Sequence, residues 1–283
     1  MNDLPDYELQ RTPDESSPPT PSSRHSSGVW VAVASLIAAA GVAAYVAFAW
    51  RPRPAPRPEP TPAPTAGAQA APPLGGQAEP VAIPPLDASD AVVRTLVRAL
   101  SESPAVAAWL STDGLIRNFT VVTANIADGA TPAKHLKQVR PSSAFQVVDR
   151  GGVVYIDTRS YDRYAVIADA AASIDPDRAA RLYATLKPRI EEAHRELGFP
   201  DQSFDRTLQR AIIALLETPV LNGSTRVTPK GIGYAFADAR LEGLTAAQKQ
   251  LLRMGPRNVR IIKERLRRIA LALGIPSDKL PSE

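Results

Sequence analysis

The chain has 283 residues, no cysteine and a formal net charge of +4 at neutral pH. The lack of cysteine excludes a disulfide framework, a thiolate zinc site and a cysteine nucleophile. The charge is divided unevenly: residues 1–85 carry five basic and seven acidic residues, so residues 86–283 carry a net charge of +6. The part from residue 86 onward has the length of one ordinary domain.

The first 50 residues predict a tail and a membrane anchor. Residues 1–27 are rich in Ser, Pro, Asp and Glu, a composition that predicts a disordered polar tail. Residues 28–50 form a run of 23 residues without a charge. A helix of this length is about 35 Å long, which is enough to cross a hydrocarbon core of about 30 Å. Because Trp30 and Trp50 lie near its ends, where aromatic rings favour the headgroup level, we predict a single-pass transmembrane helix.

Two signals for the orientation of this helix disagree. Arg11 and Arg24 precede it, whereas Arg51, Arg53 and Arg57 follow it, and the positive-inside rule then places the C-terminal part in the cytoplasm. The order of short tail, anchor, stalk and globular domain is instead common among proteins that reach into a bacterial periplasm. We predict an inner-membrane protein whose C-terminal domain is periplasmic, since long domains are exported despite flanking charge.

Residues 51–85 predict a stalk. They contain twelve prolines, seven of which alternate with other residues from Pro52 to Pro64. Alternating proline favours the polyproline II conformation, because the ring fixes φ and restricts the preceding residue. The alternating part then acts as a semi-rigid spacer of roughly 40 Å. Binding of a proline-recognising partner is the alternative interpretation.

Residues 86–283 predict one globular, mostly helical domain. Asp87 is expected to cap the first helix, the third opens at Thr112 or Asp113, and Pro188 kinks or splits the longest one. Apolar spacing and capping signals indicate helices over 87–100, 104–110, 112–128, 161–173, 175–197, 203–217, 245–254 and 256–273.

Two short strand pairs interrupt the predicted helices. Residues 145–148 and 153–157 flank the turn sequence Asp149–Gly152, which indicates a β hairpin. Residues 225–227 and 232–237 form a second pair. The predicted fold class is mainly α with two short β hairpins (α+β).

The corner between the last two helices has its own signals. Thr245 and Gln248 have the spacing of a capping box. Gly255 is expected to end the first helix with a positive φ, and Pro256 to begin the second where no amide donor is required. Leu251, Leu252 and Met254 should pack inward.

Four stretches carry a resemblance: Leu251–Asn258 (LLRMGPRN), Asp113–Arg117 (DGLIR), Ser160–Tyr164 (SYDRY) and Glu196–Pro200 (ELGFP). They resemble the signature of the bacterial domain of unknown function 3014 family, over roughly Ala88 to Ile275. Members of this family often share an N-terminal anchor, a Pro/Ala-rich stalk and a C-terminal domain, so the resemblance implies this architecture. It implies no activity, cofactor or catalytic residue.

The residues that could carry chemistry form no recognisable motif. Glu191 and His194 have the spacing of half a carboxylate-bridged di-metal site, but the sequence holds no second Glu-x-x-His, so a solvated helix face is the better interpretation. No Gly-x-Ser-x-Gly, Walker or Gly-x-Gly-x-x-Gly sequence is present. We therefore predict no catalytic residue, no metal ligand and no cofactor.

Two clusters contain residue types that are common at binding surfaces. The last helix has an apolar stripe and an opposite cationic face, which fits an anionic partner; the alternative is a core helix with a solvated outer face. The second cluster follows the first hairpin, where the alternative is the rim of a small core. The candidate partner-binding residues are Arg253, Arg257, Asn258, Arg260, Arg267, Tyr161, Arg163 and Tyr164.

These observations favour a binding function over catalysis. We expect a membrane-tethered envelope domain that binds or scaffolds a protein or an anionic polymer; nucleic acid is disfavoured in a periplasm. The alternative is an envelope hydrolase with paired carboxylates, for which Glu102, Asp113, Asp157 and Glu242 are equal candidates. The oligomeric state is not predicted.

Overall fold

The computed structural model describes residues 72–282. The predicted tail (1–27), the predicted transmembrane helix (28–50) and the alternating prolines of the stalk lie outside the described residues. Within the described range, the helices are too short or too polar to span a bilayer.

Helices dominate the described part of the chain, and two antiparallel hairpins accompany them, as predicted. The helices are α2 (Asp90–Arg98), α3 (Pro104–Trp109), α4 (Leu115–Ala127), α5 (Arg159–Asp162), α6 (Ala165–Ser173), α7 (Pro176–Glu196), α8 (Phe204–Leu216), α9 (Ala239–Glu242), α10 (Ala246–Leu252) and α11 (Pro256–Ala272). The strands are β1 (Val147–Arg150), β2 (Val153–Ile156), β3 (Val227–Lys230) and β4 (Gly233–Phe236). Short 3₁₀ turns lie at Leu86–Ala88, Ala133–His135, Lys137–Val139 and Ser277–Lys279.

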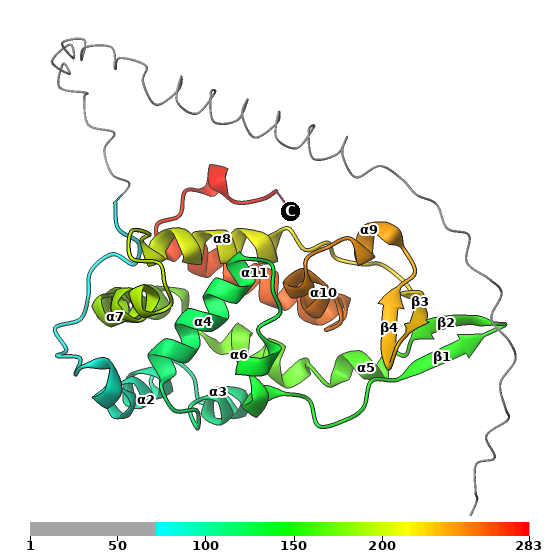
Figure 1. Ribbon diagram of the computed structural model, residues 1–283, viewed down its shortest axis with the longest axis horizontal. Coiled ribbons are helices and arrows are strands. Elements are labelled where there is room, and N and C mark those ends of the chain that lie inside the picture. Colours follow the sequence, from blue (N-terminus) through cyan, green and yellow to red (C-terminus); the bar gives the residue numbers. More distant parts are fainter. Residues whose placement is uncertain (1–71, 283) are drawn as a thin grey trace, which may run out of the picture. The chain divides into compact units, whose positions relative to one another are not determined.

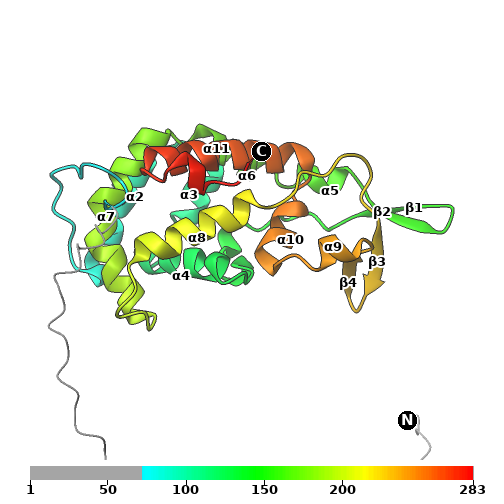
Figure 2. The same ribbon diagram turned by 90° about the horizontal axis from the view of Figure 1, so that it is seen from above.

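The helical body is built around α4, α7, α8 and α11. Helix α4 packs on α7 and α8, and α11 packs on α6, α7 and α8 (Figures 1 and 2). Phe204 at the start of α8 and Leu115 at the start of α4 are fully buried in this core. The predicted apolar stripe of α11 faces inward, since Val259 and Leu273 are buried and Leu266 packs against the core.

Helix α7 begins as the sequence indicates. The side chain of Asp175 accepts a hydrogen bond from the backbone N–H of Arg178 at 2.8 Å, and Pro176 occupies the first turn. Pro188 was predicted to kink or to split this helix; it lies inside a helix that continues to Glu196, so the split does not occur. Proline has no backbone N–H, so one hydrogen bond within the helix is missing at Pro188. The packing of α7 against α4 and α11 compensates for this loss.

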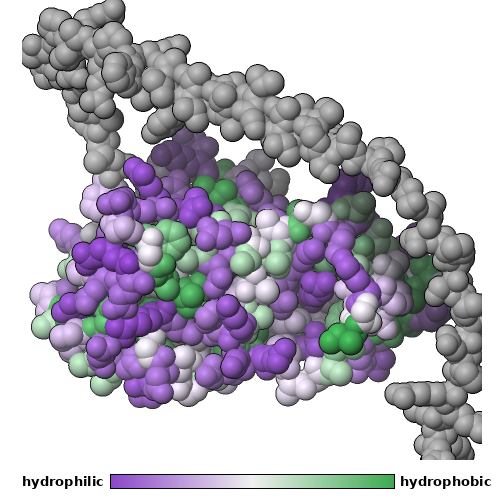
Figure 3. Space-filling view, in the orientation of Figure 1, coloured by the Kyte–Doolittle hydropathy of each residue, from purple (hydrophilic) through white to green (hydrophobic). Residues whose placement is uncertain are grey.

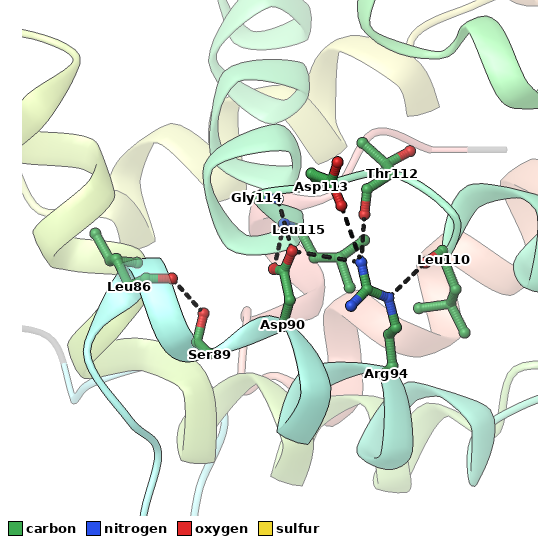
Figure 4. Close-up of polar contacts among 9 residues, drawn as sticks. All are labelled: Leu86, Ser89, Asp90, Arg94, Leu110, Thr112, Asp113, Gly114 and Leu115. Atoms are coloured by element: carbon green, nitrogen blue, oxygen red, sulfur yellow. Dashed lines mark hydrogen bonds and ion pairs between the residues drawn. The ribbon is translucent and has the colours of Figure 1, made fainter.

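The start of α4 differs from the prediction. Neither Thr112 nor Asp113 caps it; Gly114, in the left-handed conformation, precedes its first residue. The free N–H groups of Gly114 and Leu115 both donate to the carboxylate of Asp90 on α2, each at 2.8 Å (Figure 4). Because this cap comes from another helix, no local pattern could have located it.

The first residues of α2 also differ from the prediction. Asp87, expected as the cap of a helix, lies in the 3₁₀ turn Leu86–Ala88, and α2 begins only at Asp90. The hydroxyl of Ser89 donates to the carbonyl of Leu86 at 2.8 Å (Figure 4). It therefore bonds backward to the turn and leaves the first turn of α2 uncapped.

The end of the predicted stalk packs against the domain. Residues 72–85 run past α7 to α2 (cyan in Figure 1). Leu74 and Ile83 pack against the main core, and the amide of Gly75 donates to the carbonyl of Leu273 at 3.0 Å. The amide of Glu79 donates to the hydroxyl of Thr185 at 2.8 Å. The packed part of the chain therefore extends before residue 86.

The two hairpins lie at one end of the helical body (Figures 1 and 2). Gly151 and Gly152 both have positive φ, as a tight two-residue turn between β1 and β2 requires. A bridge between Tyr155 and Arg226 joins the hairpins. A second small core beneath them includes Phe236 and, from α10, Leu252.

Candidate functional site

Two of the four signature stretches meet through an arginine. Arg117 donates from Nε to Glu196 at 2.6 Å and from Nη1 to Asp87 at 2.7 Å. The hydrogen bond to Glu196 and the one to Asp87 raise the pKa of the Arg117 guanidinium, and Arg117 lowers the pKa of Glu196. This exposed contact links the start of α4 to the end of α7 within the domain.

The other two stretches meet at Gly255. This glycine has φ +85°, as predicted, and a Cβ there would lie 2.3 Å from the ring of Tyr161. Asn258 is 3% exposed, and its Nδ2 donates to the carbonyl of Tyr161 at 2.9 Å and to that of Met254 at 2.8 Å. Tyr161 and Asn258, two candidate binding residues, therefore join α5 to the corner between α10 and α11.

Arg163 and Tyr164 also make internal contacts. Arg163 donates from Nε to the carbonyl of Ser160 and from Nη1 to that of Ser143, both at 2.9 Å. Its guanidinium lies 5.1 Å from the ring centroid of Tyr164. Tyr164 is 6% exposed, and its hydroxyl accepts a hydrogen bond from Gln250 at 3.3 Å. These two residues hold the segment before β1 against α6 and α10.

The remaining candidates, all arginines, divide into internal and exposed ones. Arg253 donates to the carbonyl of Tyr234 at 3.2 Å and stacks over Phe236, and Arg267 donates to the carbonyl of Pro281. Arg257 is exposed and lies 3.8 Å from Asp169. Arg260 is exposed and has no polar partner within residues 72–282. Of the eight candidates, these last two lie on the exposed surface.

His194 is buried, whereas its position in the sequence predicted a solvated helix face. Its exposed fraction is 0%, and its ring stacks on Phe199 with 4.8 Å between centroids. The ring nitrogens lie 3.0 Å from the carbonyl of Gln202 and 3.2 Å from the hydroxyl of Thr207. Because the loop 197–203 folds back onto this face of α7, the histidine belongs to the core.

The segment between α4 and β1 forms what we call the strap, residues 129–146. Two hydrogen bonds to backbone carbonyls fix it. Asn118 donates to the carbonyl of His135 at 3.0 Å, and the hydroxyl of Ser160 donates to the carbonyl of Gln146 at 2.8 Å. Burial, and then Lys134 and Lys137, lower the pKa of His135, so this histidine is mainly neutral at pH 7. The strap is thus an ordered segment that leaves its lysines exposed.

The strap is cationic. Residues 129–148 contain Lys134, Lys137 and Arg140 but no acidic residue. None of these three has an ion-pair partner in the part of the chain that the structure describes. These three residues were not among the predicted binding residues, although the absence of acidic residues over this run is visible in the sequence. Unpaired cations on an ordered segment favour an anionic partner.

Two apolar grooves lie beneath the strap. The first, here called the strap groove, has a volume of about 470 Å³ and includes Tyr164, Gln250 and Met254 in its walls. The second, here called the lateral groove, has a volume of about 350 Å³ and lies against α3, α4 and α6. Leu136, Val139 and Ile167 line both. The face drawn in Figure 3 is mostly polar, with apolar side chains in small areas.

A third cavity of about 340 Å³ lies among the helices of the main core. Two of its lining residues, Tyr183 and Trp109, carry polar side-chain atoms but direct them elsewhere. The hydroxyl of Tyr183 donates to Asp205 at 2.5 Å, and the indole N–H of Trp109 donates to Asn118 at 3.0 Å. Burial and the contact with Asp205 raise the pKa of Tyr183, so the phenol stays protonated. This cavity offers space for hydrocarbon and no group for catalysis.

Acidic side chains are sparse in the cavities of the described residues. Residues 72–282 contain no group of three or more His, Cys, Asp or Glu side chains that could hold a metal ion. Each of the five cavities described for this range is lined by at most one carboxylate, Asp238 in one and Asp201 in another.

A family profile described as a protein of unknown function (DUF3014) matches residues 115–270, which is more than half of the chain. The chain belongs to the DUF3014 family. No curated protein and no solved structure matches it.

The DUF3014 match begins at the first residue of α4 and ends within α11. It is shorter than the range of the sequence resemblance, Ala88 to Ile275, because α2 and α3 lie outside it. The strap, both hairpins and the corner at Gly255 lie within it. The candidate site is therefore built mainly from the family domain, while α3 adds one wall of the lateral groove.

Proposed function

We propose that the domain is a binding module that recognises an anionic partner and carries out no reaction of its own. The observation that supports this proposal is the strap, whose cations Lys134, Lys137 and Arg140 lie beside two apolar grooves and lack acidic partners among the described residues. A patch of one charge steers oppositely charged molecules toward it. The proposed partner is an acidic protein or an anionic polymer.

The proposal includes a location. Residues 28–50 would tether the domain to the bacterial inner membrane as a single-pass helix, and residues 51–71 would hold it away from the bilayer. In the periplasm the strap would meet envelope proteins and envelope polymers rather than nucleic acid. The length of the uncharged run supports the membrane tether. The order of tail, anchor, stalk and domain supports a periplasmic location of the domain.

The alternative is a hydrolase with paired carboxylates, and the site gives it little support. A general acid needs a raised pKa, whereas the pKa of Asp157 is lowered to about 2, mainly by its hydrogen bonds with Arg159. The pKa of Glu242 is also lowered, first by the amide of Phe236 and then by Lys230. Both carboxylates therefore stay ionised and structurally bound at neutral pH.

Crosslinking of the full-length protein in its native membrane, followed by purification and mass spectrometry, tests the proposal. We expect an acidic protein or an anionic polymer to be recovered with the unaltered chain. The double variant Lys134→Glu/Lys137→Glu should lose most of it, because an attractive surface becomes repulsive.

A matched control is Arg98→Glu/Arg195→Glu. These arginines are exposed and lie on α2 and α7, which line neither groove, and the net charge changes by the same amount. Recovery with this control should equal that of the unaltered chain. If the strap variant recovers the partner as well as the control does, the strap is not the binding surface.

A further inference from the structure

We infer that the strap groove and the lateral groove together hold one single-chain anionic amphiphile, with its head group at Arg140 and its alkyl chain along α6 toward α3 and α4. This inference rests on the proposed function, in which the strap receives an anionic partner. The occupant of the grooves is separate from the protein or polymer proposed for the lysines of the strap: it has a carboxylate or phosphate head joined to a hydrocarbon chain.

The two grooves offer one continuous apolar surface. Leu136 and Val139 on the strap, and Ile167 on α6, belong to the walls of both. At its far end the lateral groove reaches Trp109 and Phe119, which also line the cavity of the main core. Each groove has a volume within the range of about 300–1,000 Å³ typical of small-molecule sites. An extended chain that starts at the strap can therefore follow apolar side chains into the helical body.

The lateral groove favours an alkyl chain over a peptide. Two side chains with polar atoms line it, Asn118 and Trp109. The indole N–H of Trp109 donates to Asn118 at 3.0 Å, and Nδ2 of Asn118 donates to the carbonyl of His135 at 3.0 Å. A peptide would bury its N–H and C=O groups against a wall whose polar side chains already have partners, which is costly. An alkyl chain has no such groups.

The strap end favours an anionic head group. Arg140 lines the strap groove, is exposed and has no ion-pair partner within the described range. Lys134 and Lys137 precede it on the strap, and the walls of both grooves contain no acidic side chain among the residues described. The hydroxyl of Tyr164 and the amide of Gln250 lie in the same groove as neutral polar groups. A cationic head would be repelled at this end, and an anionic head would be attracted.

The test places a photoreactive amino acid, p-benzoylphenylalanine, at position 139 of the full-length protein in its native membrane. Val139 is half-buried and lines both grooves, so the probe reacts with whatever occupies them. After irradiation, intact-mass analysis should show the addition of one amphiphile. The added mass distinguishes a free fatty acid from a lysophospholipid, both of which have one chain, and the mass of a two-chain phospholipid would overturn the inference. The control probe replaces Ile232 at the tip of the second hairpin, which is fully exposed and should give no such adduct.

Several outcomes would overturn the inference. The first is that the probe at position 139 captures a protein segment instead: a second copy of the chain, residues 51–71 of the same chain, or another protein. The others are an equal yield of amphiphile adduct at both probe positions and the lack of any adduct at position 139. A second measurement adds Arg140→Glu, which should lower the amphiphile adduct about fivefold by placing an anion beside the head group. Arg195→Glu is the matched control and should leave it unchanged; equal losses would also overturn the inference.

The two proposals fail separately. Loss of the amphiphile adduct, with continued recovery of an acidic partner that depends on Lys134 and Lys137, removes this inference and leaves the binding function. Failure of both experiments removes both.

Discussion

Arginines that look alike in the sequence differ in what their guanidinium groups contact. Arg163 binds the carbonyls of Ser160 and Ser143, so its charge stabilises the strap from inside. Arg260 lies on the exposed face of α11 without a polar partner in the described range. Helical spacing identifies both as polar positions, but only the tertiary arrangement separates a structural arginine from a free one. On α11, Lys263 and Arg267 donate hydrogen bonds to the backbone carbonyls of Thr218 and Pro281, so part of the charge on its cationic face is engaged within the domain.

The first prediction concerns Gly255→Ala. We expect the free energy of unfolding to fall by about 2–5 kcal/mol, because a Cβ is penalised at positive φ and must also displace the ring of Tyr161. Chemical denaturation of a fragment that starts at residue 72 measures this change.

Gly274→Ala is the matched control. Gly274 has nearly the same φ, +87°, but a Cβ there would meet no atom within 4 Å. Gly274→Ala should therefore lower the free energy of unfolding only by the conformational penalty of about 1–2 kcal/mol. Equal costs at the two positions would show that the contact between Tyr161 and Gly255 does not constrain the corner.

The second prediction concerns Asp157, whose pKa is lowered to about 2 chiefly by the side-chain hydrogen bond with Arg159 and then by the Arg159 amide. A lowered pKa favours the ionised form in the folded state. The carboxylate therefore contributes stability above its ordinary pKa of about 3.9, and this contribution is lost as the pH falls toward about 2. Arg159→Ala should raise the pKa of Asp157 toward its ordinary value. An NMR titration of the carboxyl group measures the shift, and a pKa that stays near 2 would contradict the assignment.

Among the helices, strands and turns, the sequence predicted the features that depend on residues close together in the chain. Thr245 and Gln248 form the predicted capping box, and Gly151 and Gly152 make the predicted hairpin turn. Elements that depend on distant partners were missed: the cap of α4 comes from Asp90, and His194 is covered by the following loop. The grooves were missed for the same reason, because their walls come from segments far apart in the chain.

The third prediction tests the corner between α10 and α11. Leu252 is buried in the small core beneath the hairpins, so Leu252→Ala should lower the free energy of unfolding by about 2–5 kcal/mol. Arg260→Glu should change it by less than about 0.5 kcal/mol, because Arg260 is exposed. Thermal melts of the same fragment compare the two. If Arg260→Glu unfolds the domain while Leu252→Ala is silent, the assignment of inner and outer faces is wrong.

For the whole molecule, the class of fold and the family could be predicted from the sequence, whereas the candidate site became visible only in the structure. The fold is mainly helical with two small hairpins, and the family match covers residues 115–270. Three of the four signature stretches lie wholly within this match, and the fourth reaches into it at Leu115. Their contacts, Arg117 with Glu196 and Tyr161 with Gly255, hold helices together. Motifs that maintain a fold reveal a family without revealing its ligand.

The last prediction concerns the orientation of the full-length chain. The arginines after residue 50 outnumber those before residue 28, which favours a cytoplasmic domain, whereas the plan of tail, anchor, stalk and domain favours a periplasmic one. We expect export, because flanking charge orients short loops more strongly than long domains. Alkaline phosphatase fused after residue 283 should then be active, and β-galactosidase at the same position should be inactive. The reverse pattern would place the strap in the cytoplasm, where acidic cytoplasmic proteins would replace envelope polymers as its partners.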